Sequence, residues 1–363
     1  MKILHITEAY GGGVFTSVNQ LVEGQIQAGH TVVLAVSPRS EAPLDWRSQL
    51  PSTVKVISLA LSRSINPVSD LKGLVQLSCL IRREKPDAIH LHSSKAGFVG
   101  RLAACVTGFS SKTFYSPRAF AYLAPGLSST KRRLYLTLEK VGQLFGGTLV
   151  ACSNDELTEA KKLTKNCVVI NNSINLSKLD SYVKNLIKKD TSVINVVTAG
   201  RVCEAKRPAL FVAVAELLKK RGIPVQFTWI GGGDDFPVTD AAVCVGWLPR
   251  KDSLQLLRES ADIYLQTSSY EGMPLSVLEA QALSLPVVVA DAIGNRSAVS
   301  HDVSGFVAMP DTAEELAVYV EKLIADKALR LRMGRQARTW VEAEFDTPLM
   351  LSRYERLYKN NNE

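Results

Sequence analysis

The amino-acid sequence predicts an α/β protein with two domains in tandem, each built on a doubly wound parallel sheet. Three observations lead to this fold class. Short β-branched runs alternate with longer helical patterns, as they do when crossover helices join parallel strands. The runs are too continuously apolar for a sheet with one wet face, which indicates helices on both faces. The 363 residues exceed one domain of roughly 150 residues, and the alternation restarts near residue 193.

The first half of the chain contains seven expected strands, which lie at 2–7, 31–37, 54–59, 88–91, 112–116, 148–152 and 168–170. Helices are expected between them at 16–28, 67–83, 96–107, 130–145 and 155–164. Lys85-Pro86-Asp87 is a stop signal for the second of these helices, because proline cannot continue a helix.

The second half repeats this alternation after a polar, lysine-rich stretch at 178–190, which suits a linker or a helix. Strands are expected at 193–198, 225–230, 242–245, 263–266, 286–290 and 305–308, and helices at 208–221, 252–260, 275–282, 312–325, 328–344 and 348–359. The expected division is a first domain at 1–175, a linker at 176–192, a second domain at 193–345 and a C-terminal helix at 346–363. Ligands of such sheets bind at the carboxyl ends of strands, so two facing domains would enclose one cleft.

Composition excludes several classes of protein. With 46% hydrophobic and 21% charged residues, the chain is neither disordered, collagen-like nor a coiled coil. No apolar run approaches the ~20 residues that span a bilayer, and the first residues are too polar for a signal peptide. The six cysteines include no Cys-x-x-Cys pair, so reduced thiols and a cytoplasmic location are expected.

Positive charge is concentrated in the first half of the chain. Residues 1–180 hold 21 Lys and Arg against 12 Asp and Glu, a net charge of +9, and the remainder carries −1. This asymmetry indicates a face that meets an anionic partner, such as nucleic acid, anionic lipid or a phosphorylated substrate.

The loop after the first expected strand contains Gly11, Gly12 and Gly13. Glycines let the backbone approach a ligand closely, and the following helix N-terminus favours an anion. The run is not a dinucleotide fingerprint, because Thr16 occupies the last glycine position and no acid follows the strand at 31–37. NAD binding is therefore weakly supported, and a phosphate loop and a plain turn both stay open.

His90 and His92 lie at the end of the strand expected at 88–91. At positions i and i+2 their side chains point to one side of the sheet. No third ligand is near them in sequence, which disfavours zinc. His92 is nearer the loop and is the better active-site candidate; a core histidine with a backbone partner is the alternative.

Two further loops carry charged residues. Arg201 and Lys206 follow the strand at 193–198 and precede a helix, where two fixed cations suit a pyrophosphate; a solvated basic turn is the alternative. Glu271 precedes the helix at 275–282, and Glu279 lies within it, eight positions on. Carboxylates there fit sugar or ribose hydroxyls, and the alternative is a capped core helix with two exposed glutamates.

Taken together, these motifs resemble those of retaining glycosyltransferases with the GT-B fold, in the large family 4 of nucleotide-sugar-dependent enzymes. Glu271 and Glu279 match the family pattern Glu-x(7)-Glu, and Arg201 and Lys206 match Arg-x(4)-Lys. The glycine loop and the sequence His-Ser-Ser-Lys-Ala-Gly at 92–97 are similar to members that build bacterial surface polysaccharides. The chain departs from the family at 172–175, where Asn-Gly-Ile/Val-Asp is usual, and at 294–298, which lacks a glutamate.

The resemblance implies roles for these residues. Arg201 and Lys206 would hold the donor pyrophosphate, Glu279 the ribose hydroxyls and Glu271 the transferred sugar, with His92 near the sugar and acceptor. The implied catalytic residues are thus His92, Glu271, Arg201 and Lys206. Further donor contacts are implied for loop residues of both domains, namely Gly12, Gly13, Gly231, Gly233, Trp247, Leu248, Gly272, Met273, Pro274 and Leu275.

The implied reaction is transfer of a hexose-type sugar from a UDP- or GDP-sugar to a hydroxyl of a lipid-linked glycan, with retention and an alpha linkage. No metal and no cofactor are expected, because fixed cations and helix N-termini can stabilise the leaving pyrophosphate. Asp234 and Asp235 are adjacent and do not form an Asp-x-Asp metal motif. Front-face substitution is implied, in which the leaving phosphate takes the acceptor proton, so Glu271 is not assigned as a nucleophile.

The resemblance further implies that the N-terminal domain would take the acceptor, that the C-terminal domain would bind the nucleotide sugar, and that the helix at 346–363 would cross back to the first domain. The excess of Lys and Arg in the first half of the chain then predicts contact with anionic lipids on the inner face of the cytoplasmic membrane. Residues expected there are Phe120, Tyr122, Leu123, Lys131, Arg132 and Arg133. Ordinary solvated helix faces are the alternative.

Two other functions compete with this interpretation. A nucleotide-sugar 2-epimerase has the same architecture, and fold alone does not exclude it. A nucleic-acid binder would explain the positive charge, but no aromatic-rich strand pair for base stacking is present, so no nucleic-acid partner is expected.

Overall fold

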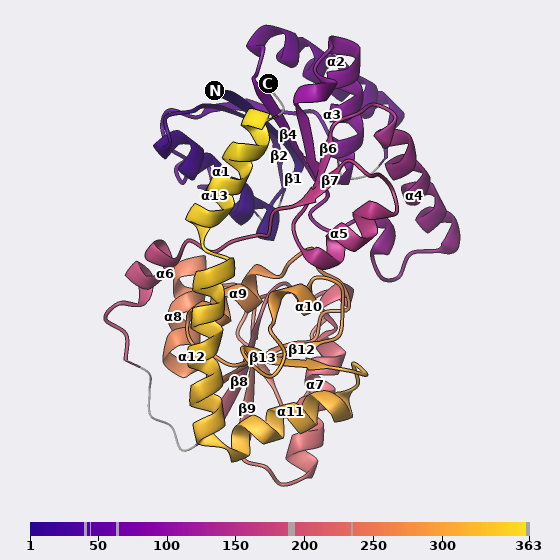
Figure 1. The fold of residues 1–363 in the computed structure, drawn as a ribbon. Coiled ribbons are helices and arrows are strands. Elements are labelled where there is room, and N and C mark those ends of the chain that lie inside the picture. Colours follow the sequence, from indigo (N-terminus) through magenta and orange to yellow (C-terminus); the bar gives the residue numbers. More distant parts are fainter. Residues whose placement is uncertain (40–41, 44, 63–64, 188–192, 234, 361–363) are drawn as a thin grey trace. The chain divides into compact units, whose positions relative to one another are not determined.

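The computed structural model describes residues 1–39, 42–43, 45–62, 65–187, 193–233 and 235–360, and it divides into two compact units (Figure 1). Unit 1 comprises Met1–Asn172 together with Pro348–Glu363, and unit 2 comprises Ser173–Thr347. Each unit contains one parallel sheet flanked by helices, which confirms the predicted α/β class.

The sheet of unit 1 has the strand order β3-β2-β1-β4-β5-β6-β7 in the described residues, and all neighbouring strands pair in parallel. The order reverses between β1 and β4, so the loops after these two strands flank the reversal. The strands are β1 (Lys2–Tyr10), β2 (Thr31–Pro38), β3 (Lys55–Ser58), β4 (Ala88–His92), β5 (Thr113–Ser116), β6 (Thr148–Ala151) and β7 (Cys167–Val169).

The central strands of this sheet are buried along their whole length because helices cover it; all five residues of β4 are buried, for example. The helix α2 begins where Asn66 caps the backbone N–H groups of Val68 and Ser69, with Pro67 in the first turn. The helices of this part, α2 included, are α1 (Gly12–Gln27), α2 (Pro67–Glu84), α3 (Ser94–Thr107), α4 (Ser129–Gln143) and α5 (Asn154–Lys161), with short 3-10 turns at Ser110–Lys112 and Ala121–Leu123.

A helix from the far end of the chain completes the core of unit 1. This helix, α13 (Thr347–Asn360), places Met350, Tyr354 and Tyr358 against residues of the sheet such as Ile3 and Phe114. In Figure 1 it lies beside α1, and the side chain of Leu351 fills the space that a Cβ at Gly24 would need.

The sheet of unit 2 has the strand order β10-β9-β8-β11-β12-β13 in the described residues and is also parallel throughout. Its order reverses between β8 and β11. The strands are β8 (Ile194–Ala199), β9 (Val225–Ile230), β10 (Val243–Cys244), β11 (Ile263–Gln266), β12 (Val287–Ala290) and β13 (Gly305–Ala308).

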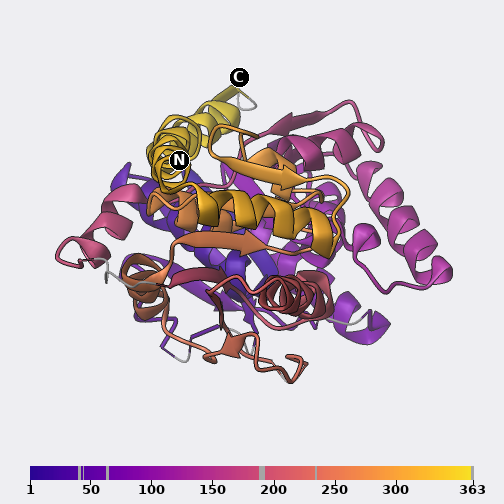
Figure 2. The same ribbon diagram turned by 90° about the horizontal axis from the view of Figure 1, so that it is seen from below.

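Helices pack on both faces of this second sheet. Figures 1 and 2 show α11 lying against it, where Leu316, Val320 and Leu323 join the core that contains Phe211 and Trp229. The helices are α6 (Leu176–Val183), α7 (Pro208–Lys220), α8 (Arg250–Ser260), α9 (Leu275–Ala282), α10 (Asn295–Ala298), α11 (Ala313–Ala325) and α12 (Lys327–Glu344).

The structure differs from the sequence expectation at three places. The stretch 176–192 contains α6, an amphipathic helix that packs against α8, and residues 188–192 lie outside the described part. The first helix begins at Gly12 instead of near Thr16, so Gly12 and Gly13 form its first turn. The short helix α10 was not anticipated. Among the described helices, none combines the length and apolarity that a bilayer-spanning segment needs.

Candidate active site

The reversal of strand order in unit 2 brings two loops together at the carboxyl edge of the sheet. One loop, 200–207, follows β8, and the other, 267–274, follows β11, the neighbour of β8. The Ser269 N–H donates to the Ala205 carbonyl at 2.9 Å, and the Thr267 hydroxyl donates to the Lys206 carbonyl at 2.8 Å. These bonds fix the two loops as one surface at the position where parallel sheets bind ligands.

Lys206 and Glu271 form an ion pair between these loops. Their Nζ and Oε1 atoms lie 2.6 Å apart, and the side chains are only 20% and 18% exposed. Gln266 also donates to Oε1 of Glu271, at 3.3 Å. The other carboxylate oxygen, Oε2, has no hydrogen-bond partner among the described residues. Burial alone lowers the pKa of Lys206, but the Glu271 carboxylate outweighs burial and the net pKa is raised. The pair therefore presents a fixed ammonium beside a carboxylate oxygen that can accept a hydrogen bond from a hydroxyl.

Arg207 holds the first loop in place. Its Nε donates to the Thr267 carbonyl at 2.6 Å, and its Nη1 pairs with Asp311 Oδ2 at 2.7 Å. The residue has φ +50 and stands immediately before α7, whose first residue is Pro208. The sequence motifs do not indicate this positioning role, although the run Lys206-Arg207-Pro208 at a helix start is visible in the sequence.

Glu279 lies within α9 and is held by an arginine from α8. Nε and Nη2 of Arg250 approach Oε1 of Glu279 at 2.9 and 2.6 Å. The Glu279 side chain is 14% exposed, and its Oε2 has no hydrogen-bond partner in the described chain. Arg201, the other predicted cation, is exposed at the start of the loop that contains Lys206. The sequence did not identify Arg250, which becomes its partner only through the packing of α8 and α9.

The glycine run after β9 packs against the same edge. A Cβ at Gly231 would collide with the Gly200 carbonyl, and one at Gly233 with the Val202 carbonyl, so only glycine lets these backbones approach. A Cβ at Gly232 would collide with the indole of Trp247, which is 60% exposed. Leu248 follows and is half-buried. The structure thus brings the predicted Gly231, Gly233 and Trp247 beside the loop after β8; Asp234 lies outside the described residues.

A third loop supports the turn that carries Glu271. The Glu271 N–H donates to the Ile293 carbonyl at 3.0 Å, and the backbone of Gly294 lies against the carbonyls of Glu271 and Gly272. Asn295 is fully buried and donates to the Ser268 carbonyl at 3.2 Å. The segment that departs from the family pattern therefore still packs under the site.

The backbone that follows Glu271 is enclosed by its neighbours. Gly272, Met273 and Pro274 are buried, and Leu275 begins α9. Their contact with sugar and phosphate stays a prediction, because a buried turn can serve packing as well as ligand binding.

In unit 1 the predicted glycines begin α1. Gly12 has φ +52, a conformation that favours glycine, and a Cβ at either Gly12 or Gly13 would meet open space. Open space leaves room for a ligand, but contact of these glycines with a phosphate stays a prediction.

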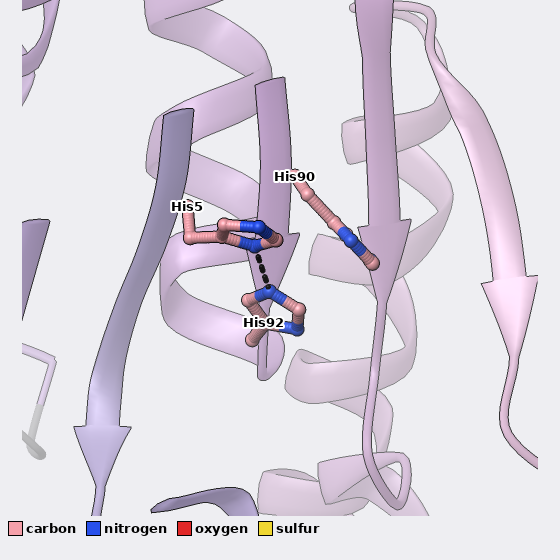
Figure 3. Close-up of side chains that lie close together, drawn as sticks. All are labelled: His5, His90 and His92. Atoms are coloured by element: carbon pink, nitrogen blue, oxygen red, sulfur yellow. Dashed lines mark hydrogen bonds between the residues drawn. The ribbon is translucent and has the colours of Figure 1, made fainter. Parts of the chain in front are cut away.

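His92 is fully buried in a cluster with His5 and His90 (Figure 3). The rings of His90 and His92 lie 4.0 Å apart, which confirms that these side chains share one side of the sheet. Nε2 of His92 is 2.9 Å from His5 Nδ1, and Nδ1 is 3.4 Å from Nη2 of Arg118. Both ring nitrogens of His92 thus have protein partners, and its catalytic role stays a prediction.

The spacing of the three histidines would suit a metal ion, since their ligand atoms all lie within 4.8 Å of one another. Every ring nitrogen nevertheless has a hydrogen-bond partner: His5 Nε2 meets Gln25 Oε1 at 2.7 Å, and His90 meets Tyr358 and Ser116 at 2.7 and 2.9 Å. A cation, Arg118, also stands beside the cluster. These contacts fit a neutral hydrogen-bonded cluster better than a metal centre. The sequence did not indicate His5, because its partners are distant in the chain.

One expected group of membrane-contact residues is corrected by the structure. Phe120 and Tyr122 are only 1% and 6% exposed, and their rings pack together in the core of unit 1, so they are not available to insert into an interface. Leu123 is half-buried against the same core. Lys131, Arg132 and Arg133 are all exposed on the first turn of α4.

Comparison with known proteins agrees with this architecture. The family Glycosyl transferases group 1 matches residues 180–340, and the family Glycosyl transferase 4-like domain matches residues 12–166. The chain is 28% identical over 327 residues, 82% of its length, to a UDP-Gal:alpha-D-GlcNAc-diphosphoundecaprenol alpha-1,3-galactosyltransferase of Escherichia coli, of which 81% is covered.

Two further proteins are similar over most of the chain. An N,N'-diacetylbacillosaminyl-diphospho-undecaprenol alpha-1,3-N-acetylgalactosaminyltransferase of Campylobacter jejuni is 27% identical, with 84% of this chain and 85% of the relative covered. The structure of sucrose-phosphate synthase from Thermosynechococcus elongatus superposes with a TM-score of 0.80 at 19% identity, covering 99% of this chain and 98% of that one. This last likeness concerns the fold alone.

Two α/β units, each built on a parallel sheet, together with the two matching family models, indicate a glycosyltransferase of the GT-B class. The chain belongs to the group 1 glycosyltransferases.

Proposed function

We propose that this glycosyltransferase moves a hexose-type sugar from a UDP- or GDP-sugar to a hydroxyl of a lipid-linked glycan in bacterial surface polysaccharide or lipopolysaccharide biosynthesis. The anomeric configuration is retained and an alpha linkage forms. The observation that carries the proposal is the Lys206–Glu271 pair at the strand reversal of unit 2. The names of the two relatives, which describe transfer to diphosphoundecaprenol-linked sugars, support the acceptor class.

The cationic side chains of loop 200–207 stabilise the nucleoside diphosphate that leaves during transfer. When the bond between the anomeric carbon and the β-phosphate oxygen breaks, negative charge develops on the nucleoside diphosphate. Lys206, with Arg201 nearby in the same loop, supplies preorganised positive charge for it. We infer that these side chains take the place that a divalent metal has in other nucleotide-sugar enzymes.

The two glutamates serve binding. Oε2 of Glu271 and Oε2 of Glu279 are the oxygens without hydrogen-bond partners in the described residues, and each can accept from a ligand hydroxyl. Glu271 accepts from the transferred sugar and Glu279 from the ribose. Trp247 offers an exposed face beside the glycine run on which a base can stack.

Retention follows a front-face course. The acceptor oxygen forms a bond to the anomeric carbon on the side from which the diphosphate leaves, and its proton passes to the departing phosphate oxygen. In this proposal Glu271 is not the nucleophile of a double displacement, because its Oε1 accepts from Lys206 and Gln266 and its Oε2 accepts from a hydroxyl of the transferred sugar.

An assay with the purified full chain tests the reaction. UDP- and GDP-sugars are incubated with a synthetic diphosphoundecaprenol-linked sugar, with and without EDTA, and the product anomer is read by NMR. The expected product is an alpha glycoside formed equally with EDTA present. A beta product or full inhibition by EDTA would contradict the mechanism, and epimerised nucleotide sugar without acceptor would identify a 2-epimerase instead.

The membrane part of the proposal rests on the exposed basic turn Lys131–Arg133 of α4. Replacing these three residues with serine is expected to reduce co-sedimentation with vesicles that contain anionic lipid, because each basic residue near such a surface is worth about 1 kcal/mol. The matched control replaces Lys219, Lys220 and Arg221 at the end of α7 with serine, which removes the same charge from unit 2. Equal loss in both variants would show general charge attraction only.

A further inference from the structure

Arg118 stands at the carboxyl edge of the unit 1 sheet, two residues beyond β5. Arg118 and the following Ala119 have φ +58 and +94, a left-handed conformation that non-glycine residues rarely adopt. Glu156 fixes this turn, because its two carboxylate oxygens accept from the N–H groups of Ala119 and Cys152 at 2.7 Å each. The fold thus maintains a strained backbone that holds one guanidinium at this edge.

The partners of this guanidinium are neutral. Nη1 donates to Asn172 Oδ1, and Nη2 lies 3.4 Å from Nδ1 of His92. Within the described residues Arg118 forms no ion pair, and its buried Nε has no hydrogen-bond partner. One further hydrogen on each terminal nitrogen is unused. Arg118 is only partly exposed, so part of its charge is withdrawn from water without a countercharge.

Neighbouring acids do not neutralise it. Glu156 is engaged by the two backbone N–H groups named above. Glu8, on the adjacent end of β1, accepts from the Ser93 hydroxyl at 2.8 Å and from the Ala96 N–H at 2.9 Å, so it occupies the start of α3. Glu8 therefore binds the first residues of α3 and does not form an ion pair with Arg118.

A directed chain of hydrogen bonds runs from Arg118 into the core. Because a guanidinium only donates, His92 Nδ1 must accept, and the ring proton of neutral His92 must lie on Nε2. That proton is donated to His5 Nδ1 at 2.9 Å, which leaves the His5 proton on Nε2, where it is donated to Gln25 Oε1 at 2.7 Å. Each residue of the chain then donates to the next, from Arg118 through the two histidines to Gln25. The buried rings thereby position Arg118.

The rings of this chain carry no compensating charge. Burial, with a smaller contribution from Arg118, lowers the pKa of His5 to about 4, and burial together with His90 and Arg118 lowers the pKa of His92 well below its ordinary value. At neutral pH the cluster is uncharged, and Arg118 is the fixed charge at this edge of the described sheet whose counterion is missing.

We propose that Arg118 binds a phosphoryl group of a substrate at the carboxyl edge of the first sheet, and that His92 and Asn172 are its positioning residues. A guanidinium with unused donors on a fixed fork matches the oxygens of a phosphate. The inference rests on the proposed function, in which both the lipid-linked acceptor and the nucleotide donor carry a diphosphate. The group can come from either source, and the experiment separates them.

The test compares Arg118→Gln with the wild type and with Arg356→Ala, which removes an equivalent charge from the exposed face of α13. If the phosphate belongs to the acceptor, Arg118→Gln raises the KM of the diphospholipid-linked acceptor about 10- to 100-fold. The KM of the same sugar on a phosphate-free alkyl chain and the Kd of UDP or GDP then change less than about 2-fold. If the phosphate belongs to the donor, the Kd of the nucleotide rises instead. Unchanged values in all three measurements overturn the proposal.

A second readout does not depend on transfer. The chain has five histidines, so single variants can assign their ring resonances in ¹⁵N NMR. The expected tautomer carries the proton on Nε2 in both His92 and His5, and inorganic pyrophosphate shifts the His92 Nδ1 resonance in the wild type but not in Arg118→Gln. A proton on Nδ1 of His92, or an identical shift in the variant, overturns the proposal. Because this measurement needs no acceptor, it can succeed even if the proposed transfer reaction fails.

Discussion

The Lys206–Glu271 pair offers a way to separate a structural role from a donor-binding role. Lys206→Ala removes the ammonium and leaves the Glu271 carboxylate without its countercharge, and Glu271→Gln does the reverse. The double variant removes both charges. The two atoms lie 2.6 Å apart, and Gln266 contacts the same carboxylate oxygen, so the three side chains act as one unit.

The expected effect on stability follows from burial. Exposed ion pairs are worth about 0.2–1 kcal/mol, and loss of one partner from a fully buried pair costs about 3–5 kcal/mol. With side chains that are 20% and 18% exposed, Lys206 and Glu271 lie between these limits. Each single variant should therefore lower the free energy of unfolding by about 2 kcal/mol, and the double variant should recover to within about 1 kcal/mol of the wild type.

Donor affinity should follow a different pattern. A charge-assisted hydrogen bond contributes about 1.5–3 kcal/mol, so Lys206→Ala should raise the Kd of UDP or GDP about 10- to 100-fold, and the double variant should do the same. Glu271→Gln should bind the nucleotide at least as tightly as the wild type, because the diphosphate then becomes the countercharge of Lys206.

Urea unfolding measures the first pattern and isothermal titration with the nucleotide measures the second. If the double variant regains nucleotide affinity along with stability, Lys206 serves the fold and not the diphosphate. If Lys206→Ala binds nucleotide like the wild type, the assignment of the donor phosphate to this loop is wrong.

Three further outcomes are expected. Glu279→Gln should weaken nucleotide binding about 10-fold but leave inorganic pyrophosphate binding unchanged by titration, and equal losses would contradict its ribose role. Gly294→Ala should cost about 1–3 kcal/mol in urea unfolding, because φ is +83 and the new Cβ would lie 2.6 Å from the Glu271 carbonyl; wild-type stability would refute this contact. Burial lowers the pKa of His5 from 6.5 to about 4, so the unfolded chain takes up its proton first. The pKa values of His90 and His92 are lowered as well, so stability should be flat above pH 6.5 and fall towards pH 4 by up to about 1.4 kcal/mol per unit for each buried histidine; a constant unfolding free energy would exclude a buried neutral cluster.

The sheets were predictable because their strands are short β-branched runs between helical patterns, and burial on both faces makes these runs mainly apolar. The donor loops were predictable for a related reason. Lys206 and Glu271 follow strands β8 and β11, and the carboxyl ends of parallel strands meet at one edge. The helix α6 was only partly predictable, because the polar, lysine-rich stretch at 178–190 suits a linker as well as a helix.

The rest of the site depends on contacts between residues far apart in the chain. His5, His92 and Arg118 come together only when β1, β4 and β5 pair. Arg118 did leave a signal, since it follows a predicted strand by two residues. Phe120 was misinterpreted because an aromatic residue near a basic run suits a membrane interface, whereas its ring in fact fills the core.

The helix α13 also has a consequence for biosynthesis. Tyr354 and Tyr358 complete the core of unit 1, yet they are translated after the whole of unit 2. During synthesis, residues 173–347 can fold as a continuous piece, while unit 1 still lacks Tyr354 and Tyr358 and the hydrogen bond between His90 and Tyr358. Unit 1 can therefore complete its core only after the whole of unit 2 has been synthesised.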